Sequence, residues 1–167
     1  MTTLAQLHLE IDSRVQAIRG SRPDWQCAQG CDACCRRLAA EPRLTAAEWD
    51  LLREGLAKLP VERLRQFAVD VADLDGRPQG PLVCPLLDRA AGACTVYAWR
   101  PVACRTYGFY VQRELGLYCH DIEARVASCA LADVVWGNHD AIDHQLAGLG
   151  EVRTLSEWFA CWQGGGP

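Results

Sequence analysis

The chain has 167 residues, 50% of them hydrophobic and 23% charged, with a formal net charge of −4. This length suits one compact domain, and the acidic balance argues against a nucleic-acid-binding protein, which would carry a basic patch. The chain contains no run of ~18 consecutive apolar residues, which is the length that would predict a transmembrane helix. The first twenty residues also lack the basic and apolar regions of an export signal. We therefore expect a single cytoplasmic domain over residues 1–167, with no nucleic-acid or membrane partner.

The first part of the chain predicts three helices. Thr45 and Glu48 form a capping box that predicts the start of the second helix, which Pro60 ends. The third helix follows from residue 61 to about residue 75. The first helix is indicated by apolar residues that recur every three or four positions and by a glycine placed to end it, namely Leu4, Leu7, Ile11, Val15, Ile18 and Gly20.

Residues 77–116 are rich in glycine and proline and predict no long regular element. Brief strands are expected in runs such as residues 93–99. Helical patterning resumes from about Asp121 to residue 137 and again over residues 142–149. A second capping box, Thr154 with Glu157, opens a last helix, and residues 164–167 are expected to form a disordered tail. The expected fold is mainly α, a small helical domain whose irregular central segment is held by a metal.

The ten cysteines carry the functional signal. In a reducing cytosol, clustered cysteines typically bind metal or perform redox chemistry instead of forming disulfides. A tetrahedral zinc site or an iron–sulfur cluster takes four thiolates, and short spacers let one turn aim several sulfurs at one ion. Eight cysteines fall in two groups, the first closely spaced and the second in or beside the irregular segment: Cys27, Cys31, Cys34 and Cys35, then Cys84, Cys94, Cys104 and Cys119.

Cys34 and Cys35 are adjacent, and adjacent side chains of an extended chain point to opposite sides. We therefore expect the two thiolates to serve different ions or different edges of a cluster. Eight thiolates also concentrate negative charge. Basic side chains beside the cysteines are candidates to offset that charge, namely Arg36, Arg37, Arg100 and Arg105.

The motif C-x3-C-x2-C-C at Cys27–Cys35, followed by CPLL at residues 84–87 and C-x-V-Y-x-x-R-P-x-x-C-R at residues 94–105, resembles the YkgJ-like cysteine-cluster family. The resemblance covers roughly residues 25–125. It implies a domain that chelates zinc or iron through the eight cysteines, with Cys119 as the eighth. A similar cysteine domain in flagellin lysine methylases hints at enzymatic use, so the sequence leaves open whether the protein is an enzyme.

Two functions follow from these residues. In the first, zinc or iron mainly folds and shapes the protein for a partner that the sequence does not name. In the second, the centre is an iron–sulfur cluster with an electron-transfer or catalytic role. A thioredoxin-like dithiol at Cys31 and Cys34 is disfavoured, because a helix and not a strand precedes it. Cys129 and Cys161 are interpreted as small buried hydrophobes, and His120 is the one histidine considered as a ligand.

Overall fold

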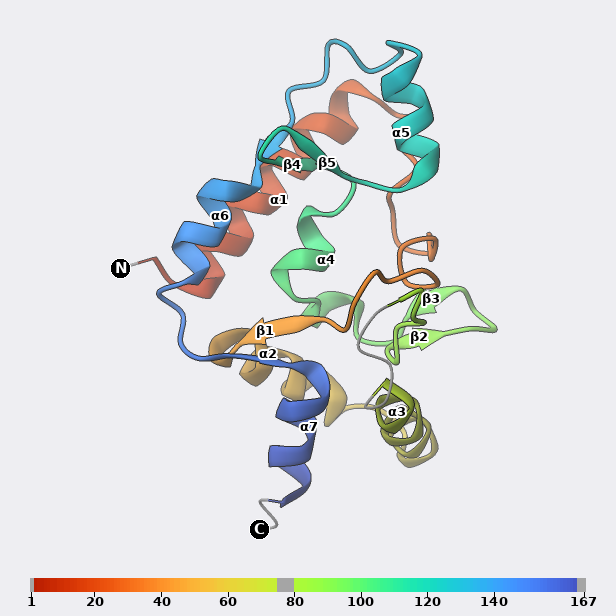
Figure 1. Ribbon diagram of the computed structural model, residues 1–167, viewed down its shortest axis with the longest axis vertical. Coiled ribbons are helices and arrows are strands. Elements are labelled where there is room, and N and C mark those ends of the chain that lie inside the picture. Colours follow the sequence, from red (N-terminus) through yellow and green to blue (C-terminus); the bar gives the residue numbers. More distant parts are fainter. Residues whose placement is uncertain (1, 75–79, 165–167) are drawn as a thin grey trace. The chain divides into compact units, whose positions relative to one another are not determined.

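The computed structural model describes residues 2–74 and 80–164 (Figure 1). Its described residues form a small mixed α/β structure, 48% helical and 13% strand. The helices are α1 (Leu4–Ser21), α2 (Ala46–Leu56), α3 (Val61–Leu74), α4 (Val102–Thr106), α5 (His120–Ala127), α6 (His139–Leu146), α7 (Leu155–Gly164) and the 3-10 helix η1 (Tyr97–Trp99). The strands are β1 (Arg43–Thr45), β2 (Leu87–Asp88), β3 (Ala93–Cys94), β4 (Tyr110–Gln112), β5 (Leu115–Leu117), β6 (Gly137–Asn138) and β7 (Val152–Thr154).

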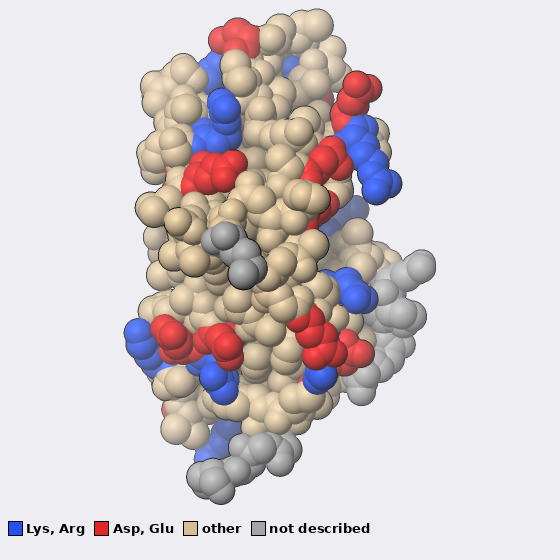
Figure 2. All heavy atoms as spheres, turned by 90° about the vertical axis from the view of Figure 1, so that its left-hand side faces the viewer, with Lys and Arg blue, Asp and Glu red and all other residues tan. Residues whose placement is uncertain are grey.

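The chain divides into two compact units. Unit 1 contains residues 1–28 and 102–149, and unit 2 contains residues 29–101 and 150–167. Each unit has its own hydrophobic cluster of buried side chains. Along the described parts of the chain, no helix is both long and apolar enough to cross a bilayer. On the face drawn in Figure 2, acidic and basic side chains are interspersed, in keeping with the small net charge of −4.

Unit 1 is organised around α1. The predicted apolar stripe of this helix is confirmed, because Leu7, Ile11, Val15 and Ile18 are all buried in the unit's hydrophobic cluster. A three-stranded sheet in the order β5-β4-β6 completes the unit, with β5 antiparallel and β6 parallel to β4. The parallel pairing sets Tyr110 opposite Gly137 and so joins the sheet to the start of α6.

Unit 2 contains two similar strand–helix segments. β1 pairs antiparallel with β7, and each strand leads directly into a helix. Both predicted capping boxes are confirmed: the Glu48 amide donates to the Thr45 hydroxyl at 3.3 Å, and the Glu157 amide donates to the Thr154 hydroxyl at 3.2 Å. The indoles that follow, Trp49 and Trp158, stack with ring centroids 6.2 Å apart. The repeated T-x-x-E-W pattern therefore marks two segments that pack together.

Several helix boundaries differ from the sequence prediction: the helix expected over residues 142–149 spans residues 139–146, and the helix expected to run up to Pro60 ends at Leu56. The helix expected over residues 121–137 ends at Ala127, because Cys129 adopts a left-handed backbone conformation with φ 58° that cannot continue a helix. Gly20 does not end the first helix, which continues through Ser21. Gly164 closes α7, whereas the rest of the expected tail, and the expected end of the third helix at residues 75–76, lie outside the described residues.

A glycine in unit 2 allows α2 to approach η1 closely. A Cβ built on Gly55 would lie 2.8 Å from Cδ2 of Trp99 and 3.0 Å from its Cβ, so the base of the indole would have to move. We expect Gly55→Ala to lower the free energy of unfolding by ~1–3 kcal/mol, the usual cost of overpacking. Urea denaturation followed by circular dichroism measures this change.

Gly20→Ala is the matched control, because Gly20 is helical and a Cβ there would meet nothing within 4 Å. This variant is expected to gain ~0.5–1 kcal/mol from the lower entropy of its unfolded state. Equal effects of the two substitutions would show that the indole does not restrict α2.

Candidate metal centre

The predicted ligand cysteines are distributed over both units. Unit 2 holds Cys31, Cys34, Cys35, Cys84 and Cys94, whereas unit 1 holds Cys27, Cys104 and Cys119. All ten cysteines of the chain are free thiols in the structure, and no disulfide joins any of them.

Cys34 and Cys35 lie in a turn and not in an extended segment. The Arg36 amide donates to the carbonyl of Asp32 at 3.0 Å, and the Arg37 amide donates to the carbonyl of Cys34 at 3.3 Å. This turn brings the two Sγ atoms within 4.0 Å of each other. The expectation that the two side chains point to opposite sides is therefore wrong, since it assumed the geometry of a strand.

A second segment supplies two further thiols at the same place. Leu38 and Leu82 form an antiparallel bridge, and the Cys84 amide then donates to the carbonyl of Cys35 at 2.7 Å. The Cys84 side chain is buried and hydrogen-bonds the Cys35 thiol. Cys94 follows in β3, which pairs with β2, and is close enough to act electrostatically on Cys34 and Cys35.

We call the four neighbouring thiols the unit 2 thiol cluster (Cys34, Cys35, Cys84 and Cys94), and their surroundings raise the pKa of three of them, Cys34, Cys35 and Cys94. A hydrogen bond with Cys34 lowers the pKa of Cys35, but the hydrogen bond with Cys84, burial and the nearby thiols outweigh it and raise that pKa to about 12. The hydrogen bond with Cys35, together with burial, raises the pKa of Cys34. Burial raises the pKa of Cys94, against the opposing effect of Arg100. Without a cation, Cys34, Cys35 and Cys94 therefore stay protonated at neutral pH.

The arginines beside the cysteines have different partners. Arg36 donates to the carboxylate of Asp32 at 2.6 Å and to the carbonyl of Arg89 at 3.1 Å. Arg100 lies 3.5 Å over the ring of Tyr97, and its positive charge lowers the pKa of Cys94. In unit 1, Arg105 pairs with Asp12 at 3.4 Å. Of these arginines, Arg100 thus has the clearest electrostatic effect on a predicted ligand.

The cysteines of unit 1 occupy distinct structural positions. Cys104 lies in α4, and Cys119 is the N-cap of α5. The carbonyl of Cys27 accepts a hydrogen bond from Nε of Arg19 at 3.2 Å. Its sulfur lies against Gly108, whose φ of 90° and lack of a Cβ leave room for it, since a Cβ there would be 2.3 Å from Sγ.

Several thiols outside the unit 2 thiol cluster are exposed. Cys31, a predicted ligand, is exposed, and so are Cys129 and Cys161. The interpretation of the last two as buried hydrophobes is therefore wrong. Cys129 lies beyond the end of α5, and the Cys161 sulfur accepts a hydrogen bond from Nη1 of Arg153 at 3.0 Å. His120 is also exposed and lies 3.6 Å from the carboxylate of Glu123.

The thiols of the unit 2 thiol cluster lie near one another but do not form a complete metal-coordination geometry. Within residues 2–74 and 80–164, no three Cys, His, Asp or Glu side chains converge in an arrangement ready to hold a metal ion. The donor set itself fits zinc or iron, because thiolate sulfur is a preferred ligand of both. The 4.0 Å between the Cys34 and Cys35 sulfurs is close to the ~3.8 Å edge of a tetrahedron of sulfurs placed ~2.3 Å from zinc.

A comparison with known families supports this interpretation of the cysteines. The profile of the CxxCxxCC family, described as "Putative zinc- or iron-chelating domain", matches residues 26–132. The chain belongs to the CxxCxxCC family. The match confirms the resemblance found in the cysteine motifs and covers well over half of the chain. Searches of curated proteins and of solved structures gave no significant match.

The burial of the thiols predicts an order of chemical reactivity. In reduced, chelator-treated protein at neutral pH, iodoacetamide should modify Cys31, Cys129 and Cys161 at least about tenfold faster than Cys35 and Cys84, because only an accessible thiolate reacts. Since the pKa of Cys35 is raised to about 12, its reaction should accelerate as the pH rises toward that value. Mass spectrometry of peptides after timed labelling measures each rate.

The denatured protein is the control, because all ten thiols should then react at similar rates. Labelling of Cys84 in the folded protein as fast as that of Cys161 would contradict the burial of the Cys84 side chain.

Proposed function

We propose that this CxxCxxCC domain binds zinc or iron through its eight patterned cysteines, and that the unit 2 thiol cluster provides one four-thiolate centre. The observation that supports this proposal best is the neighbourhood of four sulfurs from two segments, residues 34–35 and 84–94. Four thiolates complete the shell of a structural zinc ion, and the same four can hold an iron–sulfur cluster.

A cation would remove the electrostatic difficulty of the cluster. Neutral thiols bind metal weakly, and each must lose its proton to become a ligand. A divalent ion compensates two of the four negative charges, and Arg100 beside Cys94 offsets part of the remainder. The metal would thus stabilise a set of side chains that disfavour ionisation on their own.

The remaining patterned cysteines complete the proposed ligand set. Cys31 is exposed in the segment that leads to Cys34, and Cys27, Cys104 and Cys119 belong to unit 1. We include them because they belong to the family motif, which the match over residues 26–132 contains. A reducing compartment such as the cytoplasm would keep all these thiols available for metal.

Metal content of cysteine variants tests the proposal. Protein purified anaerobically should contain zinc or iron, and Cys34→Ser, Cys35→Ser, Cys84→Ser or Cys94→Ser should each lower the metal content at least about tenfold, because one ligand of four is lost. Cys129→Ser and Cys161→Ser are the matched controls, because these thiols are exposed and lie outside the motif. Elemental analysis measures zinc and iron in each variant.

The two functions that the sequence left open differ in their spectra. An iron–sulfur cluster gives a brown protein that absorbs near ~400 nm, whereas zinc is colourless because its d shell is full. Brown protein with iron and acid-labile sulfide would favour the electron-transfer or catalytic role, including methylation-related chemistry. Full metal content in Cys84→Ser would exclude the unit 2 thiol cluster as a centre.

Metal removal should loosen part of unit 2 before the rest of it. The segments at residues 31–38 and 80–96 have only short elements, and structural zinc can contribute ~10–16 kcal/mol to folding. By contrast, α2 and α7 contribute Leu52, Leu56 and Phe159 to the hydrophobic cluster. Hydrogen exchange with and without a strong chelator should show protection falling first in those two segments. Unchanged protection there after verified metal loss would show that burial alone holds them.

A further inference from the structure

A pocket of about 500 Å³ with both polar and apolar walls lies in unit 1, between α1, β4, β6 and α6. The groups relevant to binding are the side chains of Glu10, Ser13, Arg14, Tyr110 and Asn138. None of these is a cysteine, and none belongs to the proposed metal centre. The volume falls in the ~300–1,000 Å³ range of small-molecule sites.

Tyr110 provides an unused hydrogen-bonding group to this pocket. The residue is 3% exposed, and its ring packs on Gly137, where a Cβ would lie 2.3 Å from the ring. The ring also packs at right angles to the ring of His139, with centroids 6.4 Å apart. Among the residues that the structure describes, the Tyr110 hydroxyl has no hydrogen-bond partner. The hydroxyl is not among the buried polar atoms that lack a partner, so it reaches the accessible wall of the pocket and is available to a ligand or to water.

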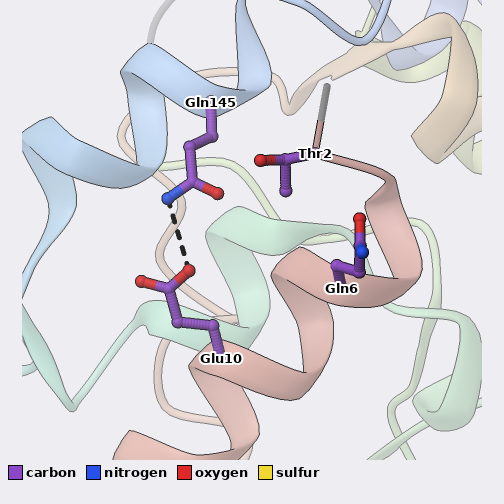
Figure 3. A pocket seen from close by; sticks show the side chains of 4 residues that line it. All are labelled: Thr2, Gln6, Glu10 and Gln145. Atoms are coloured by element: carbon purple, nitrogen blue, oxygen red, sulfur yellow. Dashed lines mark hydrogen bonds between the residues drawn. The ribbon is translucent and has the colours of Figure 1, made fainter.

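Glu10 and Arg14 place opposite charges beside the hydroxyl. They are four residues apart on α1, a spacing that commonly forms an ion pair. Within the described part of the chain, neither side chain forms one. Instead, Oε2 of Glu10 accepts from Nε2 of Gln145 at 3.3 Å, as Figure 3 shows at an adjoining pocket, and Nη1 of Arg14 contacts the carbonyl of Val135 at 3.4 Å. Other polar groups thus hold the two charges apart.

We propose that this pocket binds a free α-amino acid in its zwitterionic form, with the ammonium group on Glu10 and the carboxylate on Arg14. Residues four apart on a helix are separated by ~6 Å along its axis. The side chains of Glu10 and Arg14 can therefore reach the ammonium and carboxylate groups of one bound amino acid. Tyr110 can donate to the carboxylate, and the Ser13 hydroxyl and the Asn138 amide supply further polar contacts.

The pairing of charges disfavours other ligand classes. A phosphate or dicarboxylate would meet the negative charge of Glu10, and a polyamine would meet the positive charge of Arg14. Like charges brought together in a site oppose binding. A zwitterion satisfies both groups at once, and each contact is a charge-assisted hydrogen bond.

Titration of the full chain with the twenty standard L-amino acids, followed by calorimetry or ligand-observed NMR, tests this proposal. At least one amino acid should bind saturably below about 10 mM. Its N-acetyl derivative, which lacks the cation, and its amide, which lacks the anion, should each bind at least about tenfold more weakly. Absence of saturable binding for all twenty, or equal binding of both derivatives, would overturn the proposal.

Variants assign the binding to this pocket. Tyr110→Phe removes only the hydroxyl, and Glu10→Gln and Arg14→Gln remove one charge each, so each should weaken binding at least about tenfold. The matched controls Arg113→Gln and Glu114→Gln change the same groups in the β4–β5 turn of unit 1, outside the pocket lining, and should bind like the wild type. If the single variants Tyr110→Phe and Arg14→Gln both bind the amino acid with wild-type affinity, the amino acid binds outside this pocket and the proposal is wrong. If a variant fails to fold, the two ligand derivatives still decide the question.

Discussion

The hydrogen bond from the Cys84 amide to the Cys35 carbonyl, 2.7 Å long, holds the candidate metal centre together. It continues the bridge between Leu38 and Leu82 and fixes the register of two segments that have little regular structure. Because of this register, a turn carrying two thiols lies against a segment carrying a third, and the β2–β3 hairpin brings the fourth. A slip of one residue would turn the Cys84 side chain to the opposite face.

Local signals in the sequence were sufficient for much of the fold. The capping boxes at Thr45 and Thr154 predicted two helix starts, because the residues that form each box are neighbours in the chain. The stripe from Leu7 to Ile18 likewise predicted the buried face of α1. The pairing of β1 with β7 was not predicted, since its strands are three residues long and lie at opposite ends of unit 2's sequence. Such short strands have no readable alternation.

The candidate site was predictable in composition but not in geometry. The motif nominated eight cysteines as ligands, and the structure brings four of them, those of the unit 2 thiol cluster, near one another. The directions of the side chains depended on the backbone, and the turn at Cys34 and Cys35 reversed the expectation based on an extended chain. The early end of the helical region near Cys129 was likewise not predictable. Its left-handed residue is a cysteine, and not the glycine that usually marks such a position.

The clustered thiols and the unit 1 pocket illustrate two ways in which a fold holds polar groups that have no complete set of protein partners. In the thiol cluster, burial and neighbouring sulfurs favour the neutral form, so the groups are inexpensive to bury until a cation replaces their protons. In the pocket, Glu10, Arg14 and the Tyr110 hydroxyl line open space that water can enter. Burial raises the pKa of Tyr110 to about 12, so the hydroxyl keeps its proton and remains a hydrogen-bond donor at neutral pH. The thiols must therefore lose their protons to bind the proposed metal ion. The Glu10 and Arg14 side chains of the pocket need no such change to bind the proposed amino acid. It follows that acidification toward pH 5 should weaken the proposed metal binding, because protons compete with the metal for the thiolates.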